Sequence, residues 1–486
     1  MLSTDLIKNA LSAHSWLGLA IGAGMYLVCL SGAILTFSAE LEQWEQADTP
    51  VVTSLDIQAA TGTFNRFVAA DQGVTPHMYL VLPTSASPKA RLATEETSWF
   101  LNADGSLGPQ EDNSWTSMLI DLHYYLHLPK SWGMAVVSAL GSVLVALIIT
   151  GLLAHPGILR DAFRLRRNSS RQLFDTDLHN RLSVWASPFH LMIAVTGAWF
   201  AFAVPLITIV ADVEQRATPE ALVAEVFGAE PELAPATGEA DLVAALTQTQ
   251  QMAPDSEPFV IIVHDAGTPR AHIGVSARHP GRLIWAENYL FTLDGKFLRT
   301  DHWHDGSAGR QMVYSIYRLH FGTFAGMGMQ LLYLVMGLAL SVIAASGVNI
   351  WLSKRRREDA WGDLWVALVW GTPIALAGAA IARFSAVPIS MAAVFWSVLA
   401  ACAVCTLALT DITRSRAWLR VATSASIALL LVVHLWRFGT SGLTGKPGLI
   451  NLGLVLALLA TVRLSVNSYQ QLTTNKSHQP EATGEV

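Results

Sequence analysis

Histidines occupy matched positions in the first 350 residues of this 486-residue chain. His14 and His179 are each followed by a glycine 18 residues later, and His127 and His320 are each followed by a Gly-Met pair six residues later. Neutral imidazole is a good ligand for iron, and helical bundles hold cofactors between facing side chains. The spacing therefore predicts one bis-histidine site at His14 and His179. It predicts a second site at His127 and His320.

The cofactor that suits these pairs is non-covalent haem, as two haem b groups per chain. Haem is apolar and needs only axial ligands from the protein. Covalent c-type attachment is excluded because the chain has no Cys-x-x-Cys-His sequence. Glycines near the histidines either make room for the macrocycle or serve close helix packing. They are Gly18, Gly22, Gly24, Gly133, Gly141, Gly322, Gly326 and Gly328.

Three other histidines are alternative ligands. His190 lies three helical turns deeper than His179 in the same apolar run, His155 follows the second run, and His123 lies one turn before His127. A histidine at the edge of a membrane can instead be a polar residue at the level of the lipid headgroups. The sequence alone leaves this alternative open.

A polar motif outside the apolar runs offers a different chemistry. In Asp301-His302-Trp303-His304-Asp305, the two histidines are candidates for binding a divalent metal or contacting a substrate. His-x-His in a loop has low specificity. Nucleotide or flavin binding has no support, because no Gly-x-Gly-x-x-Gly or P-loop sequence follows a predicted strand.

Composition indicates a membrane protein. Hydrophobic residues make up 52% of the chain and charged residues 14%, and the mean hydropathy is +0.39. A soluble chain carries about 25% charged residues, so much of this surface must face lipid. The net charge of -6 excludes a nucleic-acid-binding protein, and three cysteines exclude a disulfide scaffold.

Eight apolar runs are long enough to cross a bilayer as helices. We interpret the first as a signal anchor, because it is too long for a signal peptide and lacks a small-residue cleavage site. The runs cover about residues 16–37, 133–153, 184–210, 313–352, 364–382, 388–409, 419–436 and 449–466. The fourth is overlong, so part of it should project from the membrane.

Basic loops predict the orientation. Arginine and lysine clusters follow the second, fourth and sixth runs, and all fall on the side of the N-terminus, which is then cytoplasmic. They comprise Arg160, Arg164, Arg166, Arg167, Arg171, Lys354, Arg355, Arg356, Arg357, Arg414, Arg416 and Arg420. The loops at about 40–125 and 212–312 then lie outside. Each ends in an aromatic strand and an Asp-Gly hairpin turn, at 99–105 and 289–295.

The unit of helix, outer α+β domain and helix occurs twice. Both copies have the same topology, so we expect a pseudo-two-fold axis along the membrane normal, with the last four spans as an appendage. The predicted fold is thus a polytopic α-helical membrane protein with two small periplasmic α+β domains. Its segments are 1–38, 39–125 (first domain), 126–156, 157–178 (basic loop), 179–211, 212–312 (second domain), 313–353 and 354–486 (four further helices and a tail).

Five short motifs follow one another within residues 1–355. They are His14-Ser-Trp-Leu-Gly-Leu, Leu122-His123-Tyr-Tyr-Leu-His127-Leu-Pro, Thr150-Gly151 followed by His155-Pro156, Asp177-Leu-His179, and Leu319-His320-Phe-Gly322. This set resembles the PepSY-associated transmembrane family, and the strands at 99–105 and 289–295 are similar to the ends of its PepSY domains. The chain departs from the simple four-helix member in its four extra spans. It also has Ser183 where the second His-x-x-x-Gly motif would have glycine.

The resemblance implies a bacterial inner-membrane protein of iron uptake, similar to the ferrioxamine-type siderophore reductases, which hold two b haems. We therefore expect a haem-dependent ferric-siderophore reductase. Electrons from a cytoplasmic donor, whose identity the sequence does not give, would enter at the His14–His179 site and leave at the second site. Ferrous iron is a weaker partner for hard oxygen ligands than ferric iron, so reduction releases it.

Two other functions fit the same sequence. One is a PepSY-bearing membrane module that binds or restrains a periplasmic protein, with histidines that are only structural. The other is a siderophore or metal permease that uses the last four spans. Bound haem distinguishes the reductase from both, because neither alternative requires it.

Overall fold

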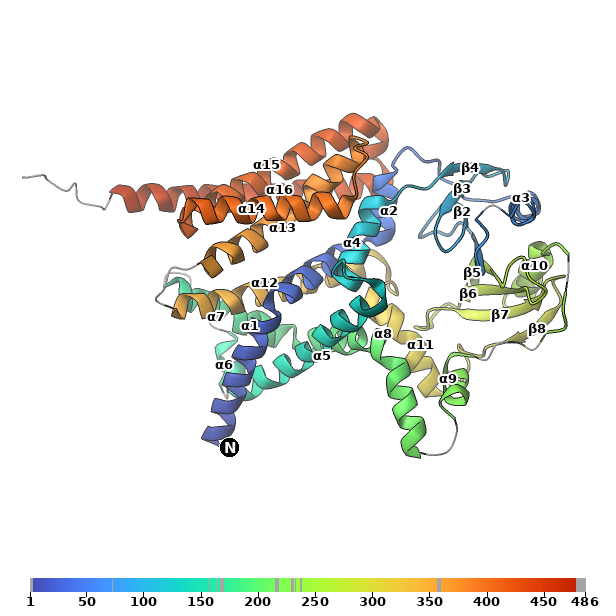
Figure 1. The fold of residues 1–486 in the computed structure, drawn as a ribbon, viewed down its shortest axis with the longest axis horizontal. Helices are drawn as coiled ribbons and strands as arrows, with labels where there is room; N and C mark the ends of the chain where they lie inside the picture. The colour runs from blue at the N-terminus through green and yellow to red at the C-terminus, as the bar shows by residue number, and fades with distance from the viewer. Residues whose placement is uncertain are drawn as a thin grey trace, which may run out of the picture. The chain divides into compact units, whose positions relative to one another are not determined.

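The computed structural model describes residues 3–71, 73–155, 157–163, 165–166, 170–214, 218–228, 231, 233–236, 238–355 and 360–477. The chain divides into two compact units (Figure 1). The helical unit comprises Met1–Asp48, Asn113–Phe200 and Gln330–Val486, and the sheet unit comprises Thr49–Asp112 and Ala201–Met329. Four members of the predicted basic clusters lie outside the described residues: Arg164, Arg167, Arg356 and Arg357.

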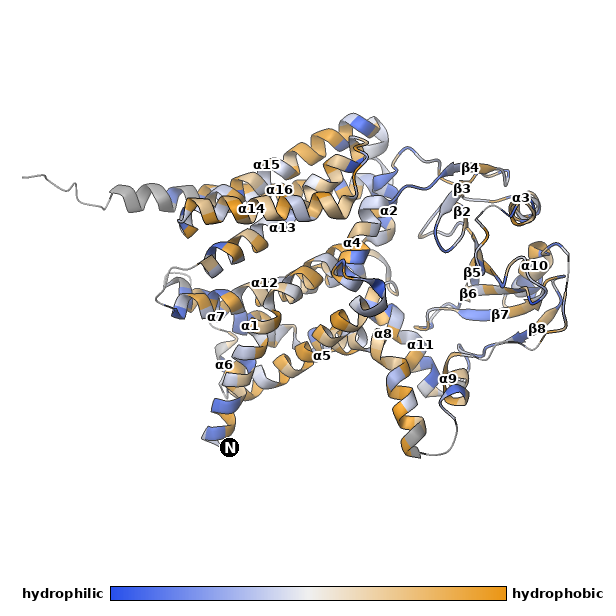
Figure 2. Ribbon diagram, in the orientation of Figure 1, coloured by the Kyte–Doolittle hydropathy of each residue, from blue (hydrophilic) through white to orange (hydrophobic). Residues whose placement is uncertain are grey.

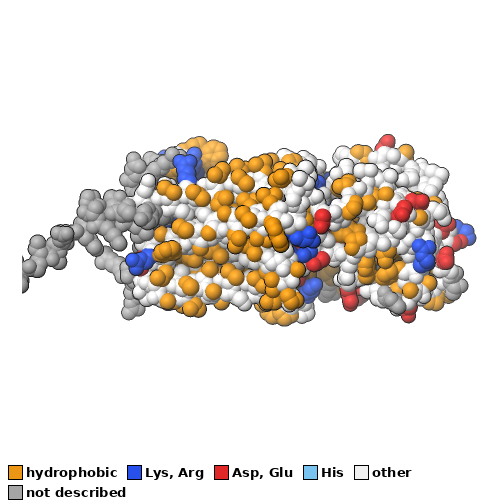
Figure 3. All heavy atoms as spheres, turned by 90° about the horizontal axis from the view of Figure 1, so that it is seen from above, with side chains coloured by type: hydrophobic (Ala, Val, Ile, Leu, Met, Phe, Trp, Pro, Cys, Tyr) orange, Lys and Arg blue, Asp and Glu red, His pale blue; other side chains and the backbone are white. Residues whose placement is uncertain are grey.

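Within the described residues, eight helices are long and apolar enough to cross a membrane, which confirms the predicted spans. Hydrophobic residues run along their length (Figure 2), and many hydrophobic side chains cover the face of the helical unit that Figure 3 shows, as expected for helices in lipid. The chain is therefore a multi-pass membrane protein. The helices are α1 (Thr4–Leu35), α5 (Lys130–Ala154), α8 (Ser187–Glu214), α12 (Gly326–Lys354), α13 (Ala360–Phe384), α14 (Met391–Leu409), α15 (Ile412–Phe438) and α16 (Gly445–Ser477).

The fourth predicted span is not one continuous helix. A separate helix, α11 (Ala308–Phe321), precedes α12. It ends because Gly322 adopts a left-handed conformation, with φ of +70°, which closes a helix at little steric cost to glycine. The overlong run is explained by this break, since α11 is not among the described helices that are apolar enough to span a membrane.

A buried carboxylate organises the helical unit. Glu45 ends the short helix α2 (Ser38–Glu45), and its two oxygens accept the backbone N–H groups of Trp115 at 2.8 Å and Thr116 at 2.9 Å. These groups belong to the first turn of α4 (Ser114–Tyr125). The backbone N–H groups of a first turn have no acceptor within their own helix. Arg383 of α13 donates to the same carboxylate at 3.0 Å.

A second buried cluster joins the last four helices to the repeat. The indole of Trp44 donates to Asn451 at 2.9 Å, and the His434 ring stacks on that indole with centres 4.6 Å apart. His434 also donates to the Trp44 carbonyl at 2.9 Å. The expectation that the last four spans form an appendage is therefore wrong, because buried polar contacts tie α13, α15 and α16 to α2 and α4.

The two predicted outer α+β domains share one sheet. It is antiparallel, with the strand order β4-β3-β2-β1-β5-β6-β7-β8 in the described residues. The first copy supplies β1 (His77–Val81), β2 (Ala90–Ala93), β3 (Ser98–Leu101) and β4 (Leu107–Gln110). The second supplies β5 (Glu257–His264), β6 (His272–Arg278), β7 (Glu287–Thr292) and β8 (Phe297–Thr300). The copies join where β1 pairs with β5, with Tyr79 opposite Ile262.

Each half of the sheet repeats one helix and one turn. The helices α3 (Ile57–Ala69) and α10 (Leu242–Met252) contribute to an apolar core with the sheet. Both predicted Asp-Gly turns are confirmed between β3 and β4 and between β7 and β8. Their glycines, Gly105 and Gly295, have φ of +76° and +78°. A Cβ on Gly295 would lie 2.6 Å from that of Ala244 on α10, so the turn packs directly on its helix.

The Glu45–Arg383 contact generates a stability prediction. Arg383→Met should destabilise the helical unit by about 3–5 kcal/mol, because it leaves a buried carboxylate without its cation. The double variant Glu45→Gln with Arg383→Met should recover part of that loss. Thermal unfolding in detergent measures both. The exposed pair Arg437–Asp48, at 3.5 Å, is the matched control, and Arg437→Met should cost about 1 kcal/mol or less. Equal losses at the two arginines would contradict the prediction.

Candidate functional site

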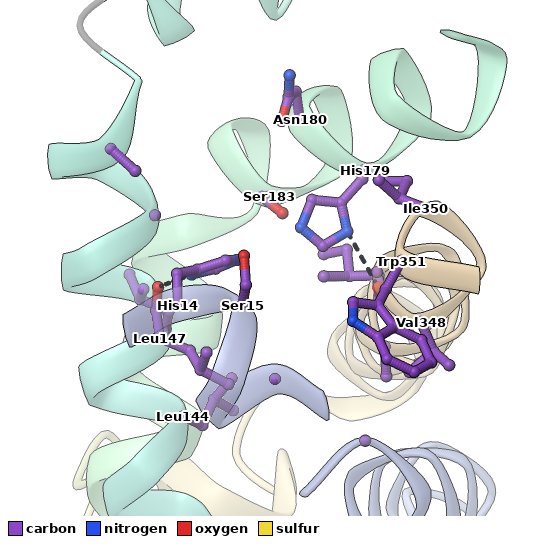
Figure 4. A pocket seen from close by; sticks show the side chains of 18 of the residues that line it. His14, Ser15, Leu144, Leu147, His179, Asn180, Ser183, Val348, Ile350 and Trp351 are labelled. Carbon is purple, nitrogen blue, oxygen red and sulfur yellow. Dashed lines mark hydrogen bonds between the residues drawn. The ribbon is translucent and has the colours of Figure 1, made fainter. Parts of the chain in front are cut away.

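A cavity of about 400 Å³ lies within the helical unit, among α1, α5, α8, α12 and α7 (Arg171–Trp185). Cofactor and ligand pockets typically measure ~300–1,000 Å³ and are mostly apolar. The lining is largely aliphatic, and it includes four histidines: His14, His155, His179 and His190. Figure 4 shows His14 and His179 reaching into the cavity from different helices.

Two contacts with α5 fix the orientation of the His14 ring. Its Nδ1 lies 3.0 Å from the carbonyl oxygen of Leu147 and 3.4 Å from the hydroxyl of Thr150. A carbonyl oxygen only accepts, so Nδ1 carries the proton and Nε2 keeps its lone pair. Histidines that ligate metals commonly donate their other N–H in this way. A Cβ on Gly151 would lie 3.1 Å from the ring, so the glycine makes room for it.

His179 repeats this arrangement on α12. Its Nδ1 lies 3.1 Å from the carbonyl oxygen of Ile343 and 3.2 Å from the hydroxyl of Ser346. A Cβ on Gly347 would lie 3.2 Å from the ring. The same tautomer follows, with Nδ1 protonated and Nε2 able to bind a metal.

The structure brings these two rings together. Their centres are 6.2 Å apart and their planes make an angle of 84°. Among the described residues, neither Nε2 has a hydrogen-bond partner. A metal–imidazole bond is about 2 Å, as for zinc, and a ring centre lies about 1 Å behind its nitrogen. Two imidazoles on opposite sides of one metal therefore have centres roughly 6 Å apart. The separation of His14 and His179 fits one metal centre held from both sides.

His123 forms a third copy of the arrangement. Its Nδ1 lies 2.8 Å from the carbonyl oxygen of Val28 and 3.3 Å from the hydroxyl of Ser31. A Cβ on Gly32 would lie 2.5 Å from the His123 ring. The ring thus sits over a glycine of α1, as His14 sits over α5 and His179 over α12.

His127, the sequence's first choice on this segment, is placed differently. Its Nε2 donates to the Met118 carbonyl at 2.8 Å, and its Nδ1 accepts the indole N–H of Trp396 at 2.8 Å. Both ring nitrogens are therefore occupied. Its backbone has φ of +56°, just beyond the end of α4.

The other two histidines of the cavity differ from His14 and His179. His190 is buried. Its Nε2 lies 3.1 Å from the carbonyl oxygen of Met336. It thus uses the nitrogen that His14 and His179 leave without a partner. His155 follows the last residue of α5 and lines the cavity.

The glycines divide between two roles. Gly18 and Gly22 line the cavity, and a Cβ on Gly22 would lie 2.8 Å from Val348. Gly141 instead permits close packing of α5 on α8, since a Cβ there would lie 3.0 Å from the Ala194 carbonyl oxygen. The sequence could not separate these roles, because both need only a missing side chain.

The remaining predicted residues belong to the sheet unit. His320 lies on α11, and its pairing across the membrane repeat stays a prediction. His302 and His304 lie after β8, where His304 contacts Glu287 at 2.7 Å and His302 contacts Asp305 at 3.1 Å.

Comparison with known proteins identifies the family. Residues 11–354 match the family described as the PepSY-associated TM region. This chain belongs to that family. The chain is also similar to an uncharacterized protein of Pseudomonas aeruginosa, with 26% identity over 250 residues. That match covers 49% of this chain, and the chain spans 63% of the length of that relative.

The sequence of this PepSY-associated transmembrane protein does contain a signal for the histidine arrangement. A Ser/Thr-Gly pair occurs in each of the first four spans, at Ser31-Gly32, Thr150-Gly151, Thr196-Gly197 and Ser346-Gly347. In three of them the structure places a histidine ring from another helix over the glycine. The relevant glycine is thus on a neighbouring helix, not 18 residues along the same one. Sequence reasoning did not identify Asn180 and Trp351 in the lining.

The contact of His123 with Gly32 generates a packing prediction. Gly32→Ala should destabilise the protein by about 1–3 kcal/mol, because the new methyl group overlaps a ring held by two contacts. His123→Ala in the same chain should relieve part of this loss. Gly453→Ala on α16 is the matched control, since a Cβ there meets nothing within 4 Å and alanine favours a helix. Thermal unfolding in detergent reports all three. A loss at Gly453 as large as that at Gly32 would refute the packing explanation.

Proposed function

We propose that this protein is a two-haem electron conduit that reduces a ferric siderophore, or a similar iron chelate, at the outer face of the bacterial inner membrane. The observation that carries the proposal is the pair His14 and His179. Both rings line one largely apolar cavity at a separation that fits one metal centre, with their Nε2 atoms available. Family membership and the spanning helices support the membrane setting.

The residues around the first site have distinct roles. His14 and His179 would hold the haem iron, and the Leu147 and Ile343 carbonyls hold each ring in the tautomer that leaves Nε2 free to bind. The walls of the cavity are largely aliphatic. At the end of α12, Lys354 lines the cavity and offers a cation that suits the carboxylates of a haem.

For the second haem we propose His123, in place of His127, as the ligand on this segment, and His320 stays the ligand that the sequence repeat predicts. His123 shares the carbonyl, hydroxyl and glycine contacts of the other two ligands, whereas both nitrogens of His127 are occupied.

Haem iron supplies one-electron transfer when bound, at a potential that axial ligands and burial set. The protein contributes the orientation of the ligands and an apolar surrounding. Release of iron follows from its chemistry, because ferrous iron binds hard oxygen ligands more weakly than ferric iron. The proposal also requires an electron donor in the cytoplasm, which the sequence does not identify.

The proposal predicts two extractable haems per chain. A pyridine haemochrome assay on purified protein should give a stoichiometry of two, and acid acetone should strip the colour. His14→Ala and His179→Ala should each remove one haem, and His123→Ala and His320→Ala should remove the other. His127→Ala should retain both.

His77→Ala in the sheet unit controls for non-specific loss. A colourless purified protein would contradict the proposal and favour a module that binds another protein. Loss of haem from His127→Ala, with none from His123→Ala, would restore the original pairing.

A second prediction concerns sidedness. The basic clusters favour a cytoplasmic N-terminus, and we therefore expect the sheet unit on the outer side. In vesicles of known orientation, chemically reduced protein should be re-oxidised by a ferric siderophore added on the outer side. The gallium-loaded siderophore, which accepts no electron under these conditions, is the control. Re-oxidation only from the cytoplasmic side would exclude the proposed direction.

A further inference from the structure

A compact group of metal-binding side chains lies in the sheet unit, in residues that the proposed electron pathway does not use. Glu287, His304 and Asp305 each present a ligand atom, and these atoms all lie within 4.8 Å of one another. Glu287 begins β7, and the other two residues lie in the loop that follows β8. They therefore come together only when the second half of the sheet has formed.

Glu287 is the unusual member of this group. Its side chain is fully buried, with 0% exposure. Its Oε2 accepts the backbone N–H of His304 at 2.8 Å and lies 2.7 Å from Nδ1 of the same residue. Its Oε1 has no hydrogen-bond partner among the described residues. A buried carboxylate with an oxygen left unpaired is costly, so this oxygen indicates a missing positive partner.

The other two ligands are already oriented. The His304 ring stacks on that of His279, with centres 4.2 Å apart and planes within 7°. His302 Nδ1 lies 3.1 Å from Asp305 Oδ1. His304 Nδ1 and Asp305 Oδ1 are 3.8 Å apart, which is close to the spacing of two ligands on one ion. Neighbours that hold first-shell ligands in this way are usual in metal sites.

We propose that Glu287, His304 and Asp305 bind a divalent first-row transition-metal ion. Mixed imidazole and carboxylate donors suit such ions, zinc among them, whereas calcium and magnesium prefer oxygen ligands alone. Three protein ligands leave a coordination position for water or an external ligand. Asp305 is 51% exposed, so the ion is reachable from solvent. The proposal of this metal site is independent of haem and of the proposed reductase activity.

The competing explanation is a structural ion pair. A protonated His304 would balance Glu287 without any metal. His77, at the start of β1, and Glu95, after β2, form such a contact at the same 2.7 Å distance. Among the described residues, His77 and Glu95 are not part of a group of three possible metal ligands. Their side chains are each 43% exposed. This pair therefore provides a control for a histidine–glutamate contact outside the three-ligand group.

The test uses the full-length chain in detergent, with any affinity tag removed and metals stripped by a chelator. Zn²⁺ is added, and bound zinc is measured by titration calorimetry and by metal analysis after gel filtration. The wild type should bind one zinc ion that Asp305→Asn and His304→Gln weaken at least about tenfold. His302→Ala should weaken zinc binding by about 10–100-fold, as loss of an orienting neighbour does. His77→Ala should leave it unchanged.

Two further arms make the outcome decisive. The titration is repeated in the His14→Ala chain, so that the membrane histidine pair cannot contribute, and the same zinc ion should still bind. Ca²⁺ added together with Zn²⁺ should not reduce zinc binding. Asp305 is exposed, so Asp305→Asn should fold normally even if a change at buried Glu287 does not. Equal zinc binding by the wild type and Asp305→Asn, or a loss caused by His77→Ala instead, would overturn the proposal.

Discussion

The arrangement of the helical unit depends on one requirement: an imidazole N–H inside an apolar bundle needs an acceptor. Each of His14, His123 and His179 finds it in a main-chain carbonyl three residues before a serine or threonine of another helix. The ring can reach that carbonyl because a glycine follows the serine or threonine. The missing side chain lets the ring lie against the helix backbone. The hydrogen bond then determines which ring nitrogen carries the proton. Position, tautomer and ligand capacity thus follow from one contact.

The helices outside the repeat also contribute to this geometry. His123 is carried by α4, and the first turn of α4 is held by the carboxylate of Glu45. Arg383, from α13, stabilises that carboxylate. A residue far along the chain therefore supports the segment that presents a candidate ligand. The last four spans lie outside the residues that match the family, yet they are part of the packing that holds α4 in place.

Local patterns predicted much of this structure. Apolar runs gave the eight spans, and Asp-Gly pairs gave both hairpin turns, because each depends on a few neighbouring residues. The choice between His123 and His127 was not accessible in this way, since it depends on Val28 and Trp396, which lie on other helices. The same holds for Glu287, a strand residue with no motif of its own. The break at Gly322 was hidden by continuous hydrophobicity on both sides.

The pairing of β1 with β5 has a consequence for synthesis of the protein. Val81 meets Val260 in the finished sheet, so the first four strands are made long before their partner. During that interval β1 is an open edge, with unpaired backbone groups that another chain could join. At the finished outer edges, β4 contains Pro109 and β8 is only four residues long, which discourages such pairing. The interior edge has no such protection, so a ribosome that stalls between the two halves would release a product prone to self-association.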